Sequence, residues 1–137
     1  MRQVSDLDFV IMLAFGRSLE AVHRNRSDFK RKALSEITDL TDHFDILEAA
    51  RVAPSGINNQ SWYFSGSDGT IHAYAARSAV TDSMNRINVG IALAHIWLAA
   101  EHEGKQATFA VEDRGRERAP RGFAYVASLS IGSGRAA

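Results

Sequence analysis

One segment of this 137-residue chain limits the possible folds more than any other. Residues 82–103 form a helix candidate, with Thr81 or Asp82 placed to cap its start and Gly104 placed to end it. One of its faces carries Ile87, Ile91, Ala94 and Leu98. Most of the remaining circumference carries Val89, Leu93, Ile96, Trp97 and Ala100. Because a helix that is apolar nearly all round must be buried on several sides, we expect it to be the central core helix or to lie at a subunit interface.

Short apolar runs on both sides of this helix predict strands. The expected strands are residues 9–15, 62–64, 70–75, 107–111 and 123–131. Within residues 65–69, the Asp68-Gly69 pair is a strong signal for a hairpin turn. Strands interspersed with helices indicate an α+β fold, so we expect a mixed β-sheet flanked by helices in a single domain of residues 1–137. Residues 132–137 are expected to form a loose tail.

A shorter helix is predicted over residues 43–52. Thr41 or Asp42 can cap its start, and Pro54 ends it because the residue before a proline avoids the α region. Helical spacing predicts a buried face made of Phe44, Leu47 and Ala50. The segment of residues 112–121 is highly charged and is predicted to be a solvated loop.

Composition excludes several classes of function. The chain has no cysteine, which rules out disulfides, thiolate metal sites and cysteine catalysis. Its 16 Lys and Arg balance 16 Asp and Glu, so no net field attracts nucleic acid or anionic membrane, and we expect neither as a partner. The five histidines lack zinc-ligand spacing, and no nucleophile elbow occurs. We therefore expect no metal and no catalytic side chain.

The N-terminal segment does not have the pattern of a signal peptide. Asp6 and Asp8 interrupt the approach to the apolar run of residues 9–15. That run is also far shorter than the ~20 residues needed to span a bilayer. We expect a cytoplasmic protein.

The segment of residues 48–62 carries the most specific motif. It resembles the signature loop of the flavin-dependent nitroreductase family, Ala-Pro-Ser-x-x-Asn-x-Gln-Pro-Trp, which follows a helix. The matching positions are Ala53, Pro54, Ser55, Asn58, Gln60 and Trp62. Ser61 stands where the family usually has proline. The resemblance implies that FMN is bound by Pro54, Ser55, Asn58 and Gln60.

The chemistry of this loop agrees with the resemblance. The pyrimidine edge of a flavin alternates carbonyl acceptors with ring nitrogens, and side-chain amides with a serine hydroxyl offer both donors and acceptors without adding charge. The alternative is that Asn58 and Gln60 merely satisfy a turn. A lone Asn-x-Gln would favour that alternative, whereas six matching positions at a helix-to-strand junction favour the flavin interpretation.

Two further stretches extend the resemblance to roughly residues 9–130. Residues 30–37 look like the segment before the signature helix, and residues 85–95 look like a helix of the branch in which one chain carries two tandem nitroreductase-like halves. We expect this chain to match the second half only. The Arg-Ser-x-Arg phosphate grip of the first half is not met, because Arg26-Ser27 is followed by Asp28 and Phe29.

A flavin phosphate needs clustered cations. The basic run Lys30-Arg31-Lys32 is the best local candidate, with Arg31 and Lys32 as expected cofactor-binding residues and Arg26 in reserve. The alternative is a solvated basic face, the usual fate of such runs.

These observations lead to two functional hypotheses. The first is an enzyme, an FMN-dependent oxidoreductase that uses NAD(P)H to reduce nitroaromatics, quinones or similar small-molecule acceptors. The second is a truncated, non-catalytic module that folds, dimerises or sequesters flavin without turnover. In both cases we expect a homodimer, because the family builds its flavin groove from two halves and the 82–103 helix has more apolar surface than one sheet face covers.

Overall fold

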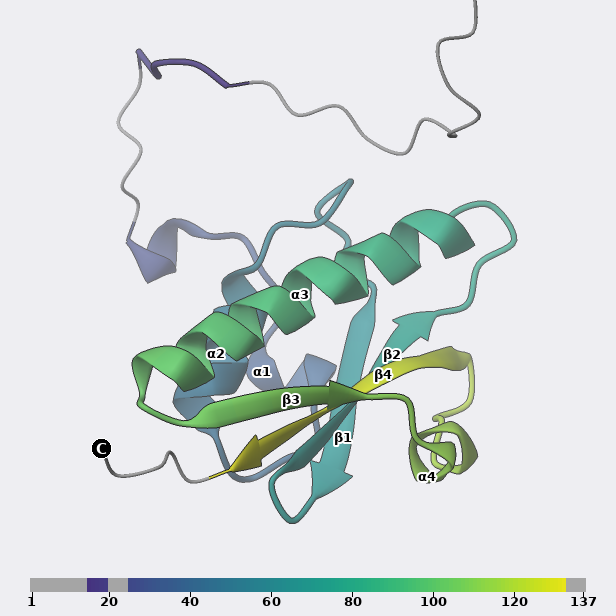
Figure 1. Ribbon diagram of the computed structural model, residues 1–137. Helices are drawn as coiled ribbons and strands as arrows, with labels where there is room; N and C mark the ends of the chain where they lie inside the picture. Colours follow the sequence, from purple (N-terminus) through teal and green to yellow (C-terminus); the bar gives the residue numbers. More distant parts are fainter. Residues whose placement is uncertain (1–14, 20–24, 133–137) are drawn as a thin grey trace, which may run out of the picture.

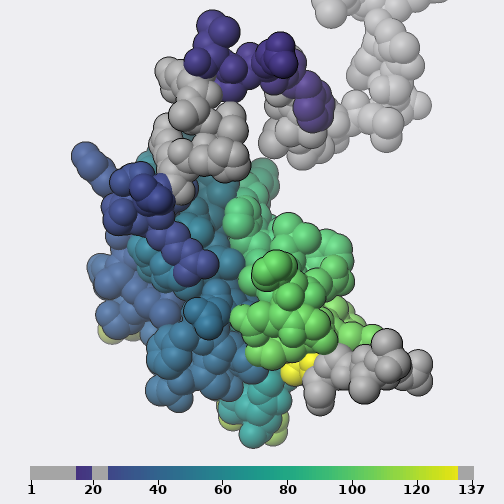
Figure 2. Space-filling model, turned by 90° about the vertical axis from the view of Figure 1, so that its left-hand side faces the viewer, coloured from purple at the N-terminus to yellow at the C-terminus, as the bar shows by residue number. Residues whose placement is uncertain are grey.

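The computed structural model describes residues 15–19 and 25–132. Its centre is the long helix α3 (Asp82–His102), which lies across one face of a four-stranded sheet (Figure 1). The helix α2 (Phe44–Val52) packs against α3 on the same face. On the side shown in Figure 2, the blue segments of residues 25–60 lie beside the green residues of α3 and β3. The α+β fold expected from the sequence is confirmed.

The sheet consists of β1 (Trp62–Ser67), β2 (Thr70–Ala76), β3 (Gln106–Ala110) and β4 (Phe123–Gly132). Its spatial order is β1-β2-β4-β3, and every neighbouring pair is antiparallel. Within the described residues, parallel pairing is limited to one bridge between Thr38 and Phe64, so the sheet is mixed only at that point.

The β1–β2 hairpin follows from its turn residues. Asp68 and Gly69 have φ angles of 54° and 74°, the left-handed pair that a two-residue turn of type I′ requires. Gly69 adopts this conformation without strain, and Asp is among the residues that tolerate it. The predicted turn is confirmed, with β1 running three residues further than expected.

The long helix ends close to the predicted positions. Thr81 is its N-cap residue, although the Thr81 side chain makes no capping hydrogen bond. At the other end Gly104 takes a φ of 71°, as a glycine just beyond a helix commonly does. The buried residues of α3 are Asn85, Asn88, Val89, Ala92, Leu93, Ile96 and Ala100.

The opposite face of α3 is exposed. Ile87 and Leu98 are 48% and 57% exposed, and Trp97 and Ala94 also face solvent. The predicted stripe of Ile87, Ile91, Ala94 and Leu98 therefore exists, but it is not part of the core. We call this the α3 stripe.

Two sequence expectations for α2 are wrong. Its N-cap is His43, with a left-handed φ of 57°, and neither Thr41 nor Asp42 takes that position. Phe44 is 57% exposed, whereas Ile46, Leu47 and Ala50 are buried. Phe44 is the first residue of the helix, and the sheet does not reach that turn. The end of α2 at Val52, two residues before Pro54, is as predicted.

Other segments also differ from expectation. The predicted loop of residues 112–121 contains a short helix, α4 (Asp113–Glu117), in which Gly115 packs directly on Tyr125. A Cβ at Gly115 would lie 2.3 Å from the Tyr125 ring, so only glycine fits. A 3₁₀ turn, η1 (Arg26–Asp28), and a short helix, α1 (Leu34–Ile37), precede α2. The strand expected over 9–15 lies outside the described residues except for Phe15, which is exposed and in no strand.

Candidate functional site

The candidate site is built around the loop of residues 54–61, which we call the amide loop. It leaves the C-terminal end of α2 and enters β1, and it lies between the basic segment of residues 30–32 and the first half of α3.

The amide loop is held in shape by its own hydrogen bonds. The Ser55 carbonyl accepts from the Asn58 N–H at 3.0 Å, and the Ser55 hydroxyl accepts from the Gln60 N–H at 3.1 Å. Asn58 and Gln60 both have positive φ angles, 56° and 42°. Asn tolerates this region, but for Gln it is uncommon, and such conformations concentrate at functional sites.

One side of the amide loop is joined to the basic segment. The Lys32 N–H donates to Gln60 Oε1 at 2.7 Å, and Lys32 Nζ donates to the Gln60 carbonyl at 3.1 Å. Arg31 Nη1 donates to Asn58 Oδ1, and Asn58 Nδ2 donates to the Lys30 carbonyl at 3.2 Å. The structure therefore brings the predicted residues of the basic run and of the loop into direct contact, although they lie about 28 positions apart.

The other side of the amide loop is joined to α3 by residues that sequence reasoning missed. Asn88 Oδ1 accepts from the Gly56 N–H at 3.0 Å, and Asn88 Nδ2 donates to Ser61 Oγ at 3.2 Å. Asn85 Nδ2 donates to the Ala76 carbonyl at 2.8 Å. Two asparagines three positions apart in an otherwise apolar helix were the available signal, because buried amides need partners.

The two amides of the loop differ in exposure. Gln60 is 3% exposed, and its side chain is fully used: Oε1 accepts from Lys32, and Nε2 donates to the backbone and side-chain oxygens of Asn58. Asn58 is exposed and retains one N–H beyond its bond to Lys30. Gln60 thus shapes the loop, and Asn58 is the amide that a ligand can reach. Of the other predicted residues, Ser55 is half-buried and Pro54 is exposed.

A cavity of about 340 Å³ opens at this junction, lined by Asp28, Phe29, Lys30, Arg31 and Asn58. The Arg31 guanidinium lies 5.4 Å from the centre of the Phe29 ring. Arg31 Nε is buried and has no hydrogen-bond partner among the described residues. A buried donor without an acceptor is costly, so this nitrogen indicates a site for an acceptor or anion.

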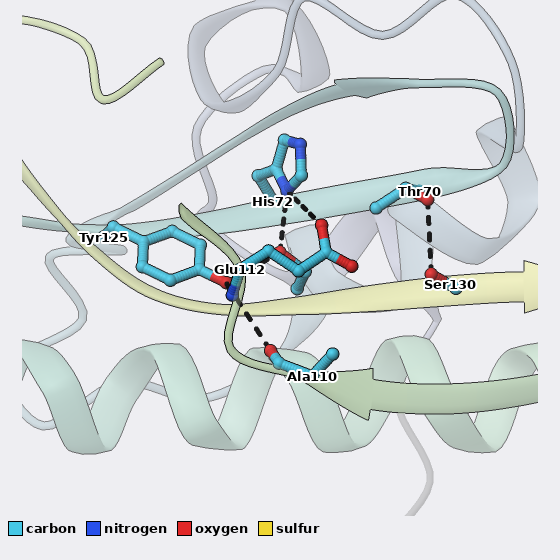
Figure 3. A network of polar contacts seen from close by, with 7 residues as sticks. Thr70, His72, Ala110, Glu112, Tyr125 and Ser130 are labelled. Atoms are coloured by element: carbon cyan, nitrogen blue, oxygen red, sulfur yellow. Dashed lines mark hydrogen bonds and ion pairs between the residues drawn. The ribbon is translucent and has the colours of Figure 1, made fainter. Parts of the chain in front are cut away.

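A second polar cluster lies on the sheet face opposite α3 (Figure 3). His72 Nδ1 and the Tyr125 hydroxyl each lie 2.7 Å from Ser128 Oγ, and the Glu112 N–H donates to the Tyr125 hydroxyl at 2.9 Å. Glu112 Oε2 is 3.9 Å from the same His72 nitrogen. A nucleophile–histidine–carboxylate relay needs the two partners on opposite ring nitrogens, so this cluster fastens the β3–α4 connection rather than activating Ser128. Among the described residues no three His, Asp or Glu side chains are grouped to hold a metal ion.

Lowering the pH is expected to reduce the folding stability of the protein through protonation of His72. Its side chain is almost fully buried, and burial lowers the pKa of His72 below its ordinary value of 6.5, with nearby Glu112 opposing part of the shift. Since the unfolded chain then binds the proton more tightly, the stability from neutral His72 is present above pH 6.5 and is lost as pH falls through the folded-state pKa. The midpoint of thermal unfolding should fall more steeply over this acid range for the wild type than for His72→Gln. Identical pH dependence in the two proteins would contradict this assignment.

The fold places the protein among known structures. An FMN-dependent nitroreductase from Clostridium difficile superposes with a TM-score of 0.57 at 17% identity, covering 79% of this chain and 86% of that one. A nitroreductase family protein from Clostridium novyi gives 0.56 at 20% identity, covering 77% and 83%. A nitroreductase with bound FMN from Desulfitobacterium hafniense gives 0.53 at 18% identity, covering 68% and 77%. The fold is that of the nitroreductase-like proteins.

The sequence places the chain more narrowly. The family model described as "Putative TM nitroreductase" matches residues 1–100, so the chain belongs to this nitroreductase family. No curated protein matches the chain. None of the helices in the described ranges is long and apolar enough to cross a lipid bilayer.

Proposed function

We propose that the protein is an FMN-dependent oxidoreductase that uses NAD(P)H to reduce nitroaromatics, quinones or similar small-molecule acceptors. The observation that carries this proposal is the cavity that the amide loop and the basic segment build together, lined by Lys30, Arg31 and Asn58. Membership of the nitroreductase family supports the same chemistry.

The residues of the cavity fit the cofactor. Arg31 and Lys30 line it and supply positive charge suited to a phosphate, with Lys32 beside them, and the exposed Asn58 offers a neutral donor for a flavin ring. Asp28 also lines the cavity, but its carboxylate is already used as acceptor for the Asn25 N–H at 3.0 Å. Bound FMN would supply the hydride and electron transfer, so the protein need only bind, orient and exclude water.

The alternative is a module that binds flavin without turnover. It is favoured by the full engagement of the Gln60 amide inside the protein, which leaves Gln60 no free group for a ligand. If the module binds flavin, the two hypotheses share the cavity and differ in whether bound FMN is reduced by NAD(P)H.

The visible absorbance spectrum decides between them. The enzyme should hold yellow FMN after purification or reconstitution, NAD(P)H should bleach it, and a quinone should restore the colour. Flavin that binds but is not bleached would support the module. No flavin binding at all would remove the enzyme and leave only a module that folds or dimerises.

The basic segment is expected to recognise the phosphate. In Arg31→Gln, Lys32→Gln, FMN affinity should fall by about 1.5–3 kcal/mol, the value of a hydrogen bond to a charged group, while riboflavin affinity changes little. Fluorescence titration with both ligands measures this. Arg118→Gln, Arg121→Gln is the matched control, because it also removes two positive charges, from exposed residues that do not line the cavity. Equal losses for FMN and riboflavin would show that the segment only supports the loop.

We also propose that the protein is a homodimer joined through the α3 stripe. The stripe presents exposed Ile87, Ala94 and Leu98, with exposed Trp97 next to Leu98, on the same helix that holds the amide loop through Asn88. A two-fold pair would cover this surface in both copies.

A further inference from the structure

A second cavity, of about 480 Å³, lies beside the N-terminal end of α3. It is lined by three arginines from three elements: Arg77 just after β2, Arg86 on α3 and Arg116 on α4. The N-terminal end of α3 and the helix α4, which carry two of these arginines, lie on the right-hand side of Figure 1. It shares no lining residue with the amide-loop cavity.

The floor of this cavity is apolar because β3 is short. β3 pairs only with residues 128–132 of β4, so residues 123–127 of β4 pair with β2 alone. Ala124 and Val126, which are buried and partly buried, line the cavity beside this unpaired edge of β4, and the exposed Val111 completes the apolar floor.

Two of the three arginines are held by hydrogen bonds through Nε. Arg77 Nε donates to the Phe123 carbonyl at 3.0 Å, and Arg86 Nε donates to Asp82 Oδ2 at 3.0 Å. Arg116 Nε lies 3.9 Å from Asp113 Oδ1.

Among the hydrogen bonds of the described residues, none uses a terminal Nη atom of these three side chains. Anchoring through Nε thus leaves the two terminal nitrogens of Arg77 and Arg86 available, the geometry that holds a carboxylate or phosphate with paired hydrogen bonds, and the exposed Arg116 can add a third guanidinium. Asp82 and Asp113 offset part of the charge of Arg86 and Arg116, but among the described residues no Asp or Glu lines the cavity itself.

We propose that this cavity binds an organic phosphate, with the phosphate held by the guanidinium groups of Arg77, Arg86 and Arg116 and the apolar body lying on β4. Three charged forks around one cavity suit a dianionic head with three oxygens better than a carboxylate with two. The apolar floor requires an attached aromatic or aliphatic group. The proposal is independent of flavin binding, because the two cavities are separate.

Isothermal titration of the full chain with phenyl phosphate tests the proposal. Inorganic phosphate tests the anionic group without a ring, and benzoate tests a ring that carries a carboxylate in place of the phosphate. Benzyl alcohol is the uncharged comparison ligand. Phenyl phosphate should bind tightest and benzyl alcohol should not bind. In Arg86→Gln, Arg116→Gln, the phenyl phosphate affinity should fall at least about tenfold, as expected when charge-assisted hydrogen bonds are removed.

Arg114→Gln, Arg121→Gln is the matched control, since it removes the same charge from exposed arginines that do not line the cavity. It should change the affinity less than about twofold. Three results would overturn the proposal: no binding of phenyl phosphate, an equal loss in the control variant, or a loss in Arg31→Gln instead. The last would place the ligand in the amide-loop cavity, while an absence of FMN binding would leave this proposal intact.

Discussion

Replacing Leu93 by glutamate should unfold the protein. Leu93 is 4% exposed and belongs to the apolar cluster in which α3 meets α2 and the sheet. The substitution loses the burial of the leucine side chain, worth about 1.5–3 kcal/mol, and a buried carboxylate without a partner costs several kcal/mol more. The total is comparable to the whole stability of an ordinary domain, about 5–15 kcal/mol. We expect circular dichroism of Leu93→Glu to show no cooperative thermal transition.

Ala94→Glu is the control for this prediction. Ala94 is the next residue on α3 and is exposed, so its variant places the same charge on the same helix without burying it. Ala94→Glu should retain a cooperative transition. A folded Leu93→Glu protein with an unchanged midpoint would mean that α3 does not sit on the sheet through this face.

The contrast between Leu93 and its neighbours shows what the sequence could and could not predict about α3. The length and the ends of α3 depend on local signals, such as Gly104, so the sequence predicts them to within one residue. Its apolar residues surround the helix, so periodicity could not choose between the face of Leu93 and that of Leu98. The choice is made by tertiary packing, because the sheet and α2 cover only the first.

The same limit explains the error in α2. Phe44 and Leu47 are three positions apart and satisfy helical spacing together, yet only Leu47 is covered by the rest of the fold. Hydrophobic periodicity identifies the apolar face of a helix, but it does not show how much of that face other elements cover.

The sequence likewise predicts only part of the candidate site. The motif located Asn58 and Gln60, and the charge run located Arg31 and Lys32. Their mutual hydrogen bonds join segments 28 positions apart, which no local pattern encodes. The sequence also could not distinguish an inward amide from an outward one. In the structure the alternative of turn satisfaction holds for Gln60, while Asn58 lies exposed at the cavity.

Replacing Leu98 by glutamate should convert the proposed dimer into a folded monomer. Leu98 is 57% exposed on the α3 stripe, so a charge there leaves the core intact. In a two-fold interface each substitution occurs twice and removes a solvent-excluded apolar contact from both copies. A cost of about 2 kcal/mol at each position would weaken the dimer on the order of 10³-fold. Sedimentation equilibrium should show a 15.0 kDa species for Leu98→Glu and twice that mass for the wild type.

Val80→Glu is the matched control, since Val80 is 91% exposed and precedes α3, away from the stripe. It should remain dimeric. A wild type that stays at 15.0 kDa at high concentration, with or without FMN, would refute the dimer. The flavin then extends the test. If a second copy completes the cavity beside Arg31, Leu98→Glu should lose FMN although no residue of that cavity has changed. If the monomeric variant binds FMN with wild-type affinity, each chain holds the cofactor alone and the α3 stripe serves association only.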